Sequence, residues 1–122
     1  MSITFTTGAI VQQKRLVKMS GAAVIHNTAT ATDDPIGVSA FYGASGDVIS
    51  VQGLSGEEPV EVTAAGAFSA GVSLYAAADG KVQALPSANG TYRRVGKSAE
   101  AATADGDIVL MIPINDGSTA TV

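Results

Sequence analysis

Glycine recurs in this chain at intervals that suit short strands joined by tight turns. Residues 71–82 and 95–110 each open near a glycine, run through small residues, turn at a second glycine and resume as a β-branched run. Residues 37–48 form a third segment of this kind. Glycine adopts positive φ without the steric cost of a Cβ, so the pattern is typical of a turn-rich β-protein. We expect four of these glycines at turns or strand ends: Gly71, Gly80, Gly96 and Gly106.

The core must be built mainly from small aliphatic residues, because the 122 residues include three Phe, three Tyr and no Trp. A chain of this length suits one domain and buries roughly 65% of its unfolded surface. Cysteine is absent, which excludes disulfides and thiolate metal sites. The predicted fold is all-β: a small single-domain sandwich or barrel of short antiparallel strands joined by Gly-rich turns.

The chain divides into a β-domain over residues 9–115, an N-terminal arm over residues 1–8 and a flexible tail over residues 116–122. Ile3 and Phe5 lie on one side of the arm, which either adds to a sheet edge or lies along a neighbouring molecule, with a frayed terminus as the alternative. We expect deletion of residues 2–7 to abolish partner binding and leave the fold intact.

The segment 108–114 is apolar on both faces, so it is either central in a sandwich or buried by another subunit. Pro113 lacks an N–H and marks an edge or the end of this strand. Asn89-Gly90 predicts a tight turn between strands at 82–85 and 91–95. Residues 98–104 are compatible with a single helical turn.

Charge excludes several classes of partner. A net charge of -4 argues against nucleic acid, whose phosphates require a basic surface. No apolar run has the length of a membrane span or the form of a signal peptide. Three cations precede every acid in the chain, namely Lys14, Arg15 and Lys18.

No constellation of reactive residues is apparent. His26 is the only histidine, and a catalytic base requires a positioned nucleophile and an orienting acid. One histidine and scattered carboxylates do not give the spacing of a metal site. We therefore expect no enzymatic activity, no metal and no cofactor.

Three segments in order, residues 36–51, 67–82 and 95–111, resemble the small capsid decoration (cement) proteins of tailed bacteriophages. The resemblance extends over residues 20–114, and its most specific part is the Leu-Tyr…Asp-Gly-Lys-Val run within 67–82. It implies a small β-rich protein without catalytic residues that binds the outside of the mature head, usually as a homotrimer, at junctions of the major capsid protein. Its location would be the virion, after assembly in the host cytoplasm.

The family supplies no residue-level binding motif, so contact residues are inferred from this sequence alone. Residues of the arm and the basic cluster are the candidates for capsid contact: Ser2, Ile3, Phe5, Lys14, Arg15 and Lys18. Residues of the two-faced strand are the candidates for subunit contact: Ile108, Leu110, Met111, Ile112 and Ile114.

Two other functions compete with this one. A carbohydrate- or surface-binding β module would need a row of exposed aromatic side chains, for which four are available: Phe41, Tyr42, Tyr75 and Tyr92. A hydrolytic enzyme would have to depend on His26, which cannot support catalysis alone.

Overall fold

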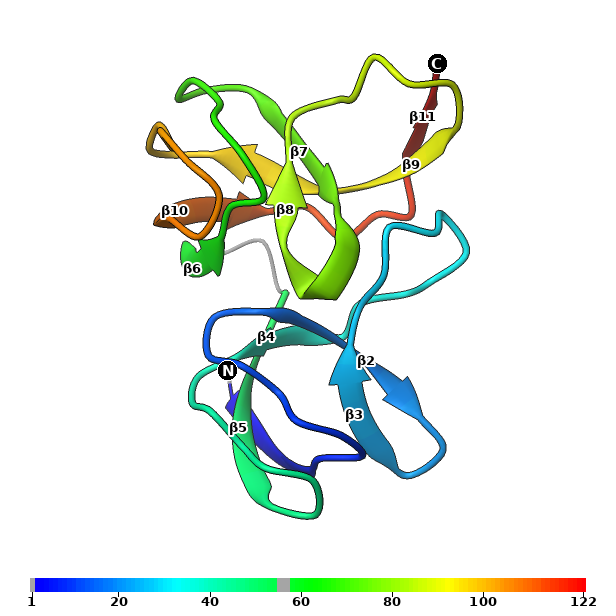
Figure 1. Ribbon diagram of the computed structural model, residues 1–122, viewed down its shortest axis with the longest axis vertical. Coiled ribbons are helices and arrows are strands. Elements are labelled where there is room, and N and C mark those ends of the chain that lie inside the picture. Colours follow the sequence, from blue (N-terminus) through cyan, green and yellow to red (C-terminus); the bar gives the residue numbers. More distant parts are fainter. Residues whose placement is uncertain (1, 55–57) are drawn as a thin grey trace.

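A computed structural model describes residues 2–54 and 58–122 as eleven strands and one short helix. The N-terminal half holds β1 (Ser2–Thr6), β2 (Leu16–Ser20), β3 (Ala23–His26), β4 (Gly37–Ser39) and β5 (Val48–Gly53). The C-terminal half holds β6 (Val60–Thr63), β7 (Ser73–Ala76), the 3-10 helix η1 (Ala78–Gly80), β8 (Val82–Gln83), β9 (Thr91–Ser98), β10 (Ile108–Pro113) and β11 (Thr119–Thr121). The halves lie end to end along the long axis of the molecule (Figure 1).

Each half contains one sheet, and the two sheets have the same strand order. The N-terminal sheet runs β1-β5-β4-β2-β3, with every neighbouring pair antiparallel. The C-terminal sheet runs β6-β10-β9-β7-β8, also antiparallel, and β11 pairs with β9. Neither sheet closes into a barrel. The all-β prediction is confirmed, and the open sheets agree with the sandwich alternative.

The loops of the two halves are fastened in the same way. Each half has one parallel and one antiparallel isolated bridge at matching places: Thr7–Val24 and Val11–Gly43, then Ala64–Val82 and Phe68–Ala102. Two buried serines also match, since Ser39 Oγ donates to Gln12 O at 2.6 Å and Ser98 Oγ donates to Ser69 O at 2.8 Å. The chain therefore contains an internal structural repeat, which we call the duplication, in which residues 3–53 correspond to residues 60–113.

The duplication corrects part of the repeat that the glycines predicted. Residues 37–48 and 95–110 are true equivalents. The first segment runs from β4 into β5, the second runs from β9 into β10, and these strand pairs have the same places in the two sheets. Residues 71–82 instead form the β7–β8 hairpin and correspond to the β2–β3 hairpin. At the turn before each hairpin, Lys14 (φ 56°) occupies the position that Gly71 (φ 82°) has in the other half.

Three of the four glycines singled out have positive φ, as a turn position requires: Gly71 (82°), Gly80 (71°) and Gly106 (95°). The prediction for Gly96 is wrong, since this residue lies inside β9. A Cβ at Gly96 would lie 2.6 Å from the carbonyl oxygen of Ile112 on the neighbouring strand. Its equivalent, Gly37, has the same constraint from the carbonyl oxygen of Gln52. Both glycines are needed because two backbones approach closely there.

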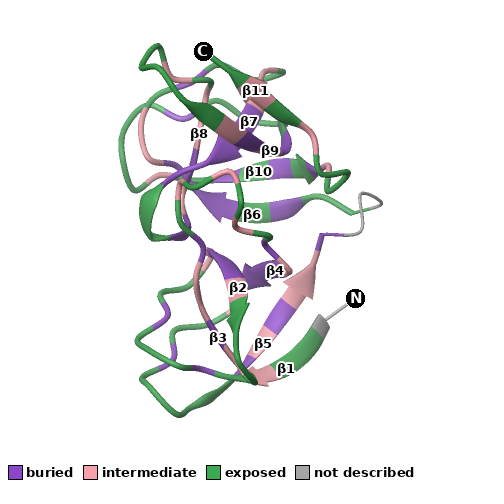
Figure 2. Cartoon of the chain, turned by 90° about the vertical axis from the view of Figure 1, so that its right-hand side faces the viewer, coloured by how far each residue is buried: buried purple, intermediate pink, exposed green. Residues whose placement is uncertain are grey.

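The hydrophobic core consists of two clusters of unequal size. The smaller lies within the N-terminal half and contains Val11, Val17, Val24, Ile49 and Val51. The larger lies mainly in the C-terminal half, and it also includes three N-terminal residues: Leu16, Val38 and Leu54. Buried residues thus continue through the junction between the halves (Figure 2). The N-terminal sheet packs its outer face, at Leu16 and Val38, onto the C-terminal core.

Hydrogen bonds also cross the junction: Thr63 N and Oγ1 to Lys14 O (2.9 Å each), Gly80 N to Asn27 O (2.8 Å) and Arg15 Nη1 to Asp79 O (2.9 Å). An ion pair of 2.9 Å joins Arg93 Nη2 to Asp34 Oδ1. Apolar packing and satisfied backbone groups therefore hold the halves together as one unit.

Both chain ends belong to the sheets. Residues 2–6 follow the sheet-edge alternative predicted for the arm: they form the edge strand β1, paired along its length with β5, and Phe5 packs against the N-terminal core. Deleting residues 2–7 would therefore remove a strand of the sheet, so the fold is not expected to survive this deletion intact. Residues 119–121 form β11 against β9 instead of a flexible tail.

Two local predictions are also wrong. Residues 99–104 contain no helical turn. The strand β8 pairs with β7 and not with β9, so Asn89-Gly90 does not join a hairpin of the predicted strands. No helix among the described residues is long and apolar enough to cross a membrane.

Candidate functional site

An apolar groove of about 340 Å³ opens on the N-terminal half. We call it the N-terminal groove; it is lined by Ile3, Phe5, Met19, Ile36, Val51 and Gly53. The strand β1 contributes Ile3 and Phe5, which alternate with outward-facing threonines and so share one face of the strand. Ile3 is 52% exposed and Met19 is 41% exposed, although both are large apolar side chains. Nothing in the described part of the chain covers this groove.

The same positions in the C-terminal half are closed. Ile3 pairs with Val51 on β5, as Val60 pairs with Met111 on β10, which fixes the correspondence. The equivalents of five groove residues are at most 2% exposed: Val60 for Ile3, Val62 for Phe5, Ala76 for Met19, Val95 for Ile36 and Met111 for Val51. These residues share one buried cluster with Leu16, Val38 and Leu54 of the N-terminal half. One half therefore closes the groove of the other.

A second apolar surface lies on β10, the strand predicted to make subunit contacts. Its side chains alternate between buried and exposed, as expected for a strand with one face on the core. The exposed residues are Ile108 (42%), Leu110 (37%) and Ile112 (42%), which we call the outer stripe. Met111, predicted as a subunit contact, is instead fully buried in the core, and Ile114 is half-buried. The strand ends at Pro113, as predicted.

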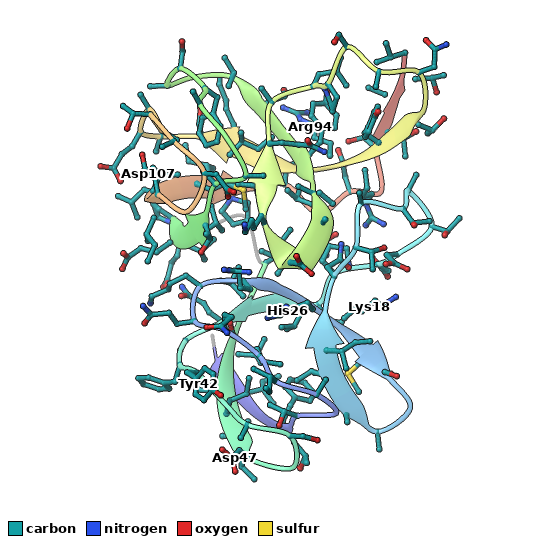
Figure 3. The ribbon with its side chains drawn as sticks, viewed as in Figure 1. Lys18, His26, Tyr42, Asp47, Arg94 and Asp107 are labelled. Carbon is teal, nitrogen blue, oxygen red and sulfur yellow. The ribbon has the colours of Figure 1, made fainter. Side chains whose placement is uncertain are left out.

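The three cations predicted to face a capsid all have partners within the chain. Lys14 lies 3.9 Å from Glu61, and the guanidinium of Arg15 donates to a backbone carbonyl across the junction. Lys18 pairs with Asp33 at 2.9 Å (Lys18 is labelled in Figure 3). The Thr28 hydroxyl, followed by Lys18, holds the pKa of Asp33 below its usual range. The basic cluster therefore serves internal contacts and does not form one free surface.

His26 has a structural position. Its Nε2 accepts a hydrogen bond from the backbone N–H of Gln12 at 2.9 Å (His26 is labelled in Figure 3). Burial, and then the nearby charge of Arg15, lower the pKa of His26. The neutral ring is the form that can accept this bond. Among residues 2–54 and 58–122, no three His, Asp or Glu side chains gather as a metal site would require.

The aromatic side chains do not form a row. Phe41 and Tyr42 are 64% and 56% exposed in the loop between β4 and β5, where Tyr42 points outward (Figure 3). Tyr75 is buried in the C-terminal half, and the hydroxyl of Tyr92 donates to the carbonyl of Ala88 at 3.0 Å. Two adjacent rings remain, which is a small platform for stacking a sugar.

Comparison with known proteins identifies the family of this chain. A family model described as phage cement protein matches residues 1–113, which span both halves of the duplication. The chain therefore belongs to the phage cement protein family, and its role is structural and capsid-associated. The family membership predicted from the sequence is confirmed, and the family places the chain with the virion capsid.

One solved structure extends the comparison to the fold. The crystal structure of the head fiber gp8.5 N base in bacteriophage phi29 matches with a TM-score of 0.72 and 21% sequence identity, over 94% of this chain and 94% of that chain. At this identity the likeness shows a shared fold. No curated protein matches the sequence.

Proposed function

We propose that this protein binds the outer surface of a mature phage head and stabilises the shell by contacting the major capsid protein. The observation that supports this most directly is the match of the cement family over both halves. Two uncovered apolar surfaces, the N-terminal groove and the outer stripe, add a physical reason. Contiguous exposed apolar side chains are a feature of interaction sites, and neither surface is covered by described residues.

The N-terminal groove is our candidate for capsid contact. Ile3 and Phe5, predicted from the sequence to contact the capsid, both line it, and Ser2 precedes them at the start of β1. We do not assign capsid contacts to the predicted basic residues, because each has an internal partner. Contact through the groove also leaves β1 in its own sheet, so it does not require this strand to detach.

The outer stripe is our candidate for subunit contact in a homotrimer. A specific interface buries ~800 Å² on each partner, about a seventh of the 5751 Å² surface of this chain. The chain therefore has room for a subunit contact besides a capsid contact, and a trimer links three head-binding sites and gains avidity. Ile108, Leu110 and Ile112 form a continuous apolar row that could be buried between subunits.

Cosedimentation with undecorated, expanded heads of the phage whose genome encodes the chain tests the proposed function. We expect the wild-type protein to pellet with the heads and to raise the temperature at which they rupture. If the protein stays in the supernatant at every concentration, the proposed function is wrong.

Sedimentation velocity tests the trimer separately. Replacing Leu110 with Asp places a charge in the outer stripe and should shift the protein to monomer. Leu85→Asp is the matched control, because Leu85 is 46% exposed in the same half but outside the stripe. If both variants sediment like the wild type, the stripe is not the subunit contact.

We also propose that the protein performs no chemistry. His26→Ala should leave head binding unchanged, because the ring only accepts a backbone hydrogen bond. A hydrolytic activity that disappears with this substitution would support an enzyme instead.

A further inference from the structure

We propose that the N-terminal groove receives clustered aliphatic side chains from the shell protein, in the way that the C-terminal half receives Leu16, Val38 and Leu54. The inference rests on the proposed function and specifies what the capsid must present at this site. The partner would insert apolar side chains that project from a sheet face or a loop. It would not bind through a charged surface or by adding a strand to the sheet.

The duplicated half is the template for this contact. The C-terminal positions are buried, and the cluster that buries them includes three aliphatic side chains of the other module. The N-terminal groove has the same strand positions and the same apolar character, but it is open. Aliphatic side chains, which help to bury the C-terminal positions, are therefore the kind of side chain that fits the N-terminal groove.

Two of the three filling side chains, Leu16 and Val38, have polar equivalents on the C-terminal sheet. Leu16 pairs with Val38 on the outer face of the N-terminal sheet. The equivalent pair on the C-terminal sheet is Ser73 with Lys97, which is polar. A second copy therefore cannot fill the open groove by repeating the contact within the chain. Such a head-to-tail contact would also risk an open filament. This points to a different chain, and the proposed function makes that chain the shell protein.

The charges around the groove favour the same kind of occupant. None of the six lining residues is titratable. Lys18, which neighbours Met19 in sequence, is paired with Asp33 at 2.9 Å. An anionic or cationic partner would find no free opposite charge in the groove itself. Binding should thus depend on apolar burial, and a tenfold rise in salt should change the affinity by less than about twofold.

The test measures binding of three variants to undecorated heads. Ile3→Asp and Met19→Asp place a carboxylate in the groove, which should weaken binding at least ~10-fold because a buried charge is costly. Ile10→Asp is the matched control, since Ile10 is 55% exposed in the same half but does not line the groove. Circular dichroism and thermal unfolding verify that each variant folds.

A second measurement uses the unaltered protein. Met19 is 41% exposed and should oxidise readily to the sulfoxide in the free protein, whereas Met111 is fully buried and should resist. On heads, Met19 should become protected, which mass spectrometry of its peptide detects. This readout remains decisive if the aspartate variants do not fold.

The outcomes separate this inference from the proposed function. Wild-type binding that is lost in both groove variants, with Met19 protected on heads, supports the inference. Equal binding by all variants, or Met19 that oxidises as fast on heads as in solution, overturns it but leaves head binding standing. Groove variants that change the sedimentation of the free protein identify a second copy as the occupant and also overturn it. Failure of the wild type to bind heads refutes the proposed function itself.

Discussion

The two halves of this protein share a strand order and matching bridges, yet only one of them has a closed core. In the C-terminal half, Val60 and Met111 are at most 2% exposed, and side chains of the other half complete their cluster. In the N-terminal half, the equivalent of Val60 is Ile3, which is 52% exposed. One of the two equivalent contacts is made within the chain; the other is uncovered by described residues, and we propose that the shell protein makes it.

This difference shows that one strand topology, used twice in a chain, can leave an apolar surface uncovered in one copy only. Most equivalent positions carry different side chains, and two of these differences bear on the junction: Leu16 corresponds to Ser73 and Val38 to Lys97. Those changes make the outer face of the C-terminal sheet polar at the positions of this pair, whereas the outer stripe on β10 of the same sheet stays apolar. The open apolar end then remains at the N-terminal half, where β1 lies.

The largest effect should come from the glycines that both halves need for close strand packing. Gly37→Ala and Gly96→Ala each place a Cβ against a carbonyl oxygen of the neighbouring strand. We expect a loss of roughly 3 kcal/mol of unfolding free energy in each case, measured by urea denaturation. Gly66→Ala is the control, because its Cβ would meet no atom within 4 Å. Near-neutral effects at both glycines would mean that the sheets are packed less closely than described.

Equivalent apolar positions should then respond unequally. Val60→Ala removes a fully buried side chain and should cost roughly 1.5–3 kcal/mol of unfolding free energy. Ile3→Ala should cost well under ~1 kcal/mol, because half of this side chain is already in water. Chemical denaturation of the two variants measures the contrast. Equal losses would show that the N-terminal groove is closed in solution.

The buried serines should behave alike, since the duplication preserves their bonds. The Oγ of Ser39 accepts from the backbone N–H of Arg15, and the Oγ of Ser98 accepts from that of Val72, each at 3.1 Å. Replacing either serine with Ala should cost about 1–3 kcal/mol, because a backbone N–H loses its partner. The double variant should lose close to the sum. A large loss at only one serine would break the equivalence of the halves.

The smallest effect is a pH dependence confined to the N-terminal half. Burial lowers the pKa of His26, so the folded protein binds a proton less readily than the unfolded chain. Stability should therefore fall as the pH drops below about 6.5, the pKa of an unperturbed histidine. The equivalent position in the C-terminal half is Ala84, which does not titrate. Thermal unfolding of His26→Gln should lack this slope between neutral and mildly acidic pH; an unchanged slope would assign it to another group.

Some of this structure can be predicted from the sequence, because local chemistry specifies it. The turns at Gly71, Gly80 and Gly106 are predictable because glycine adopts the positive φ that these turns have. The end of β10 is predictable because Pro113 lacks the N–H that a strand interior needs. The family resemblance and the all-β class both depend on the regular spacing of glycine turns between short apolar runs.

The rest depends on contacts between distant residues. Gly96 has no turn to signal it, since its constraint comes from a strand more than ten residues away. Equivalent positions such as Leu16 and Ser73 differ in character, so the duplication is not visible from residue similarity. The periodicity of Ile3 and Phe5 does indicate a half-buried strand, but which partner it pairs with is decided by the far-off β5.

The central claim is that the half left open within the chain is the half that meets the shell. An electron cryomicroscopy reconstruction of decorated heads tests this most directly. We predict that β1 and the N-terminal groove face the capsid, with an aliphatic projection of the shell protein seated between Ile3 and Met19 and the C-terminal half pointing outward. A reconstruction in which the C-terminal half rests on the shell and the N-terminal groove opens to solvent would contradict the account.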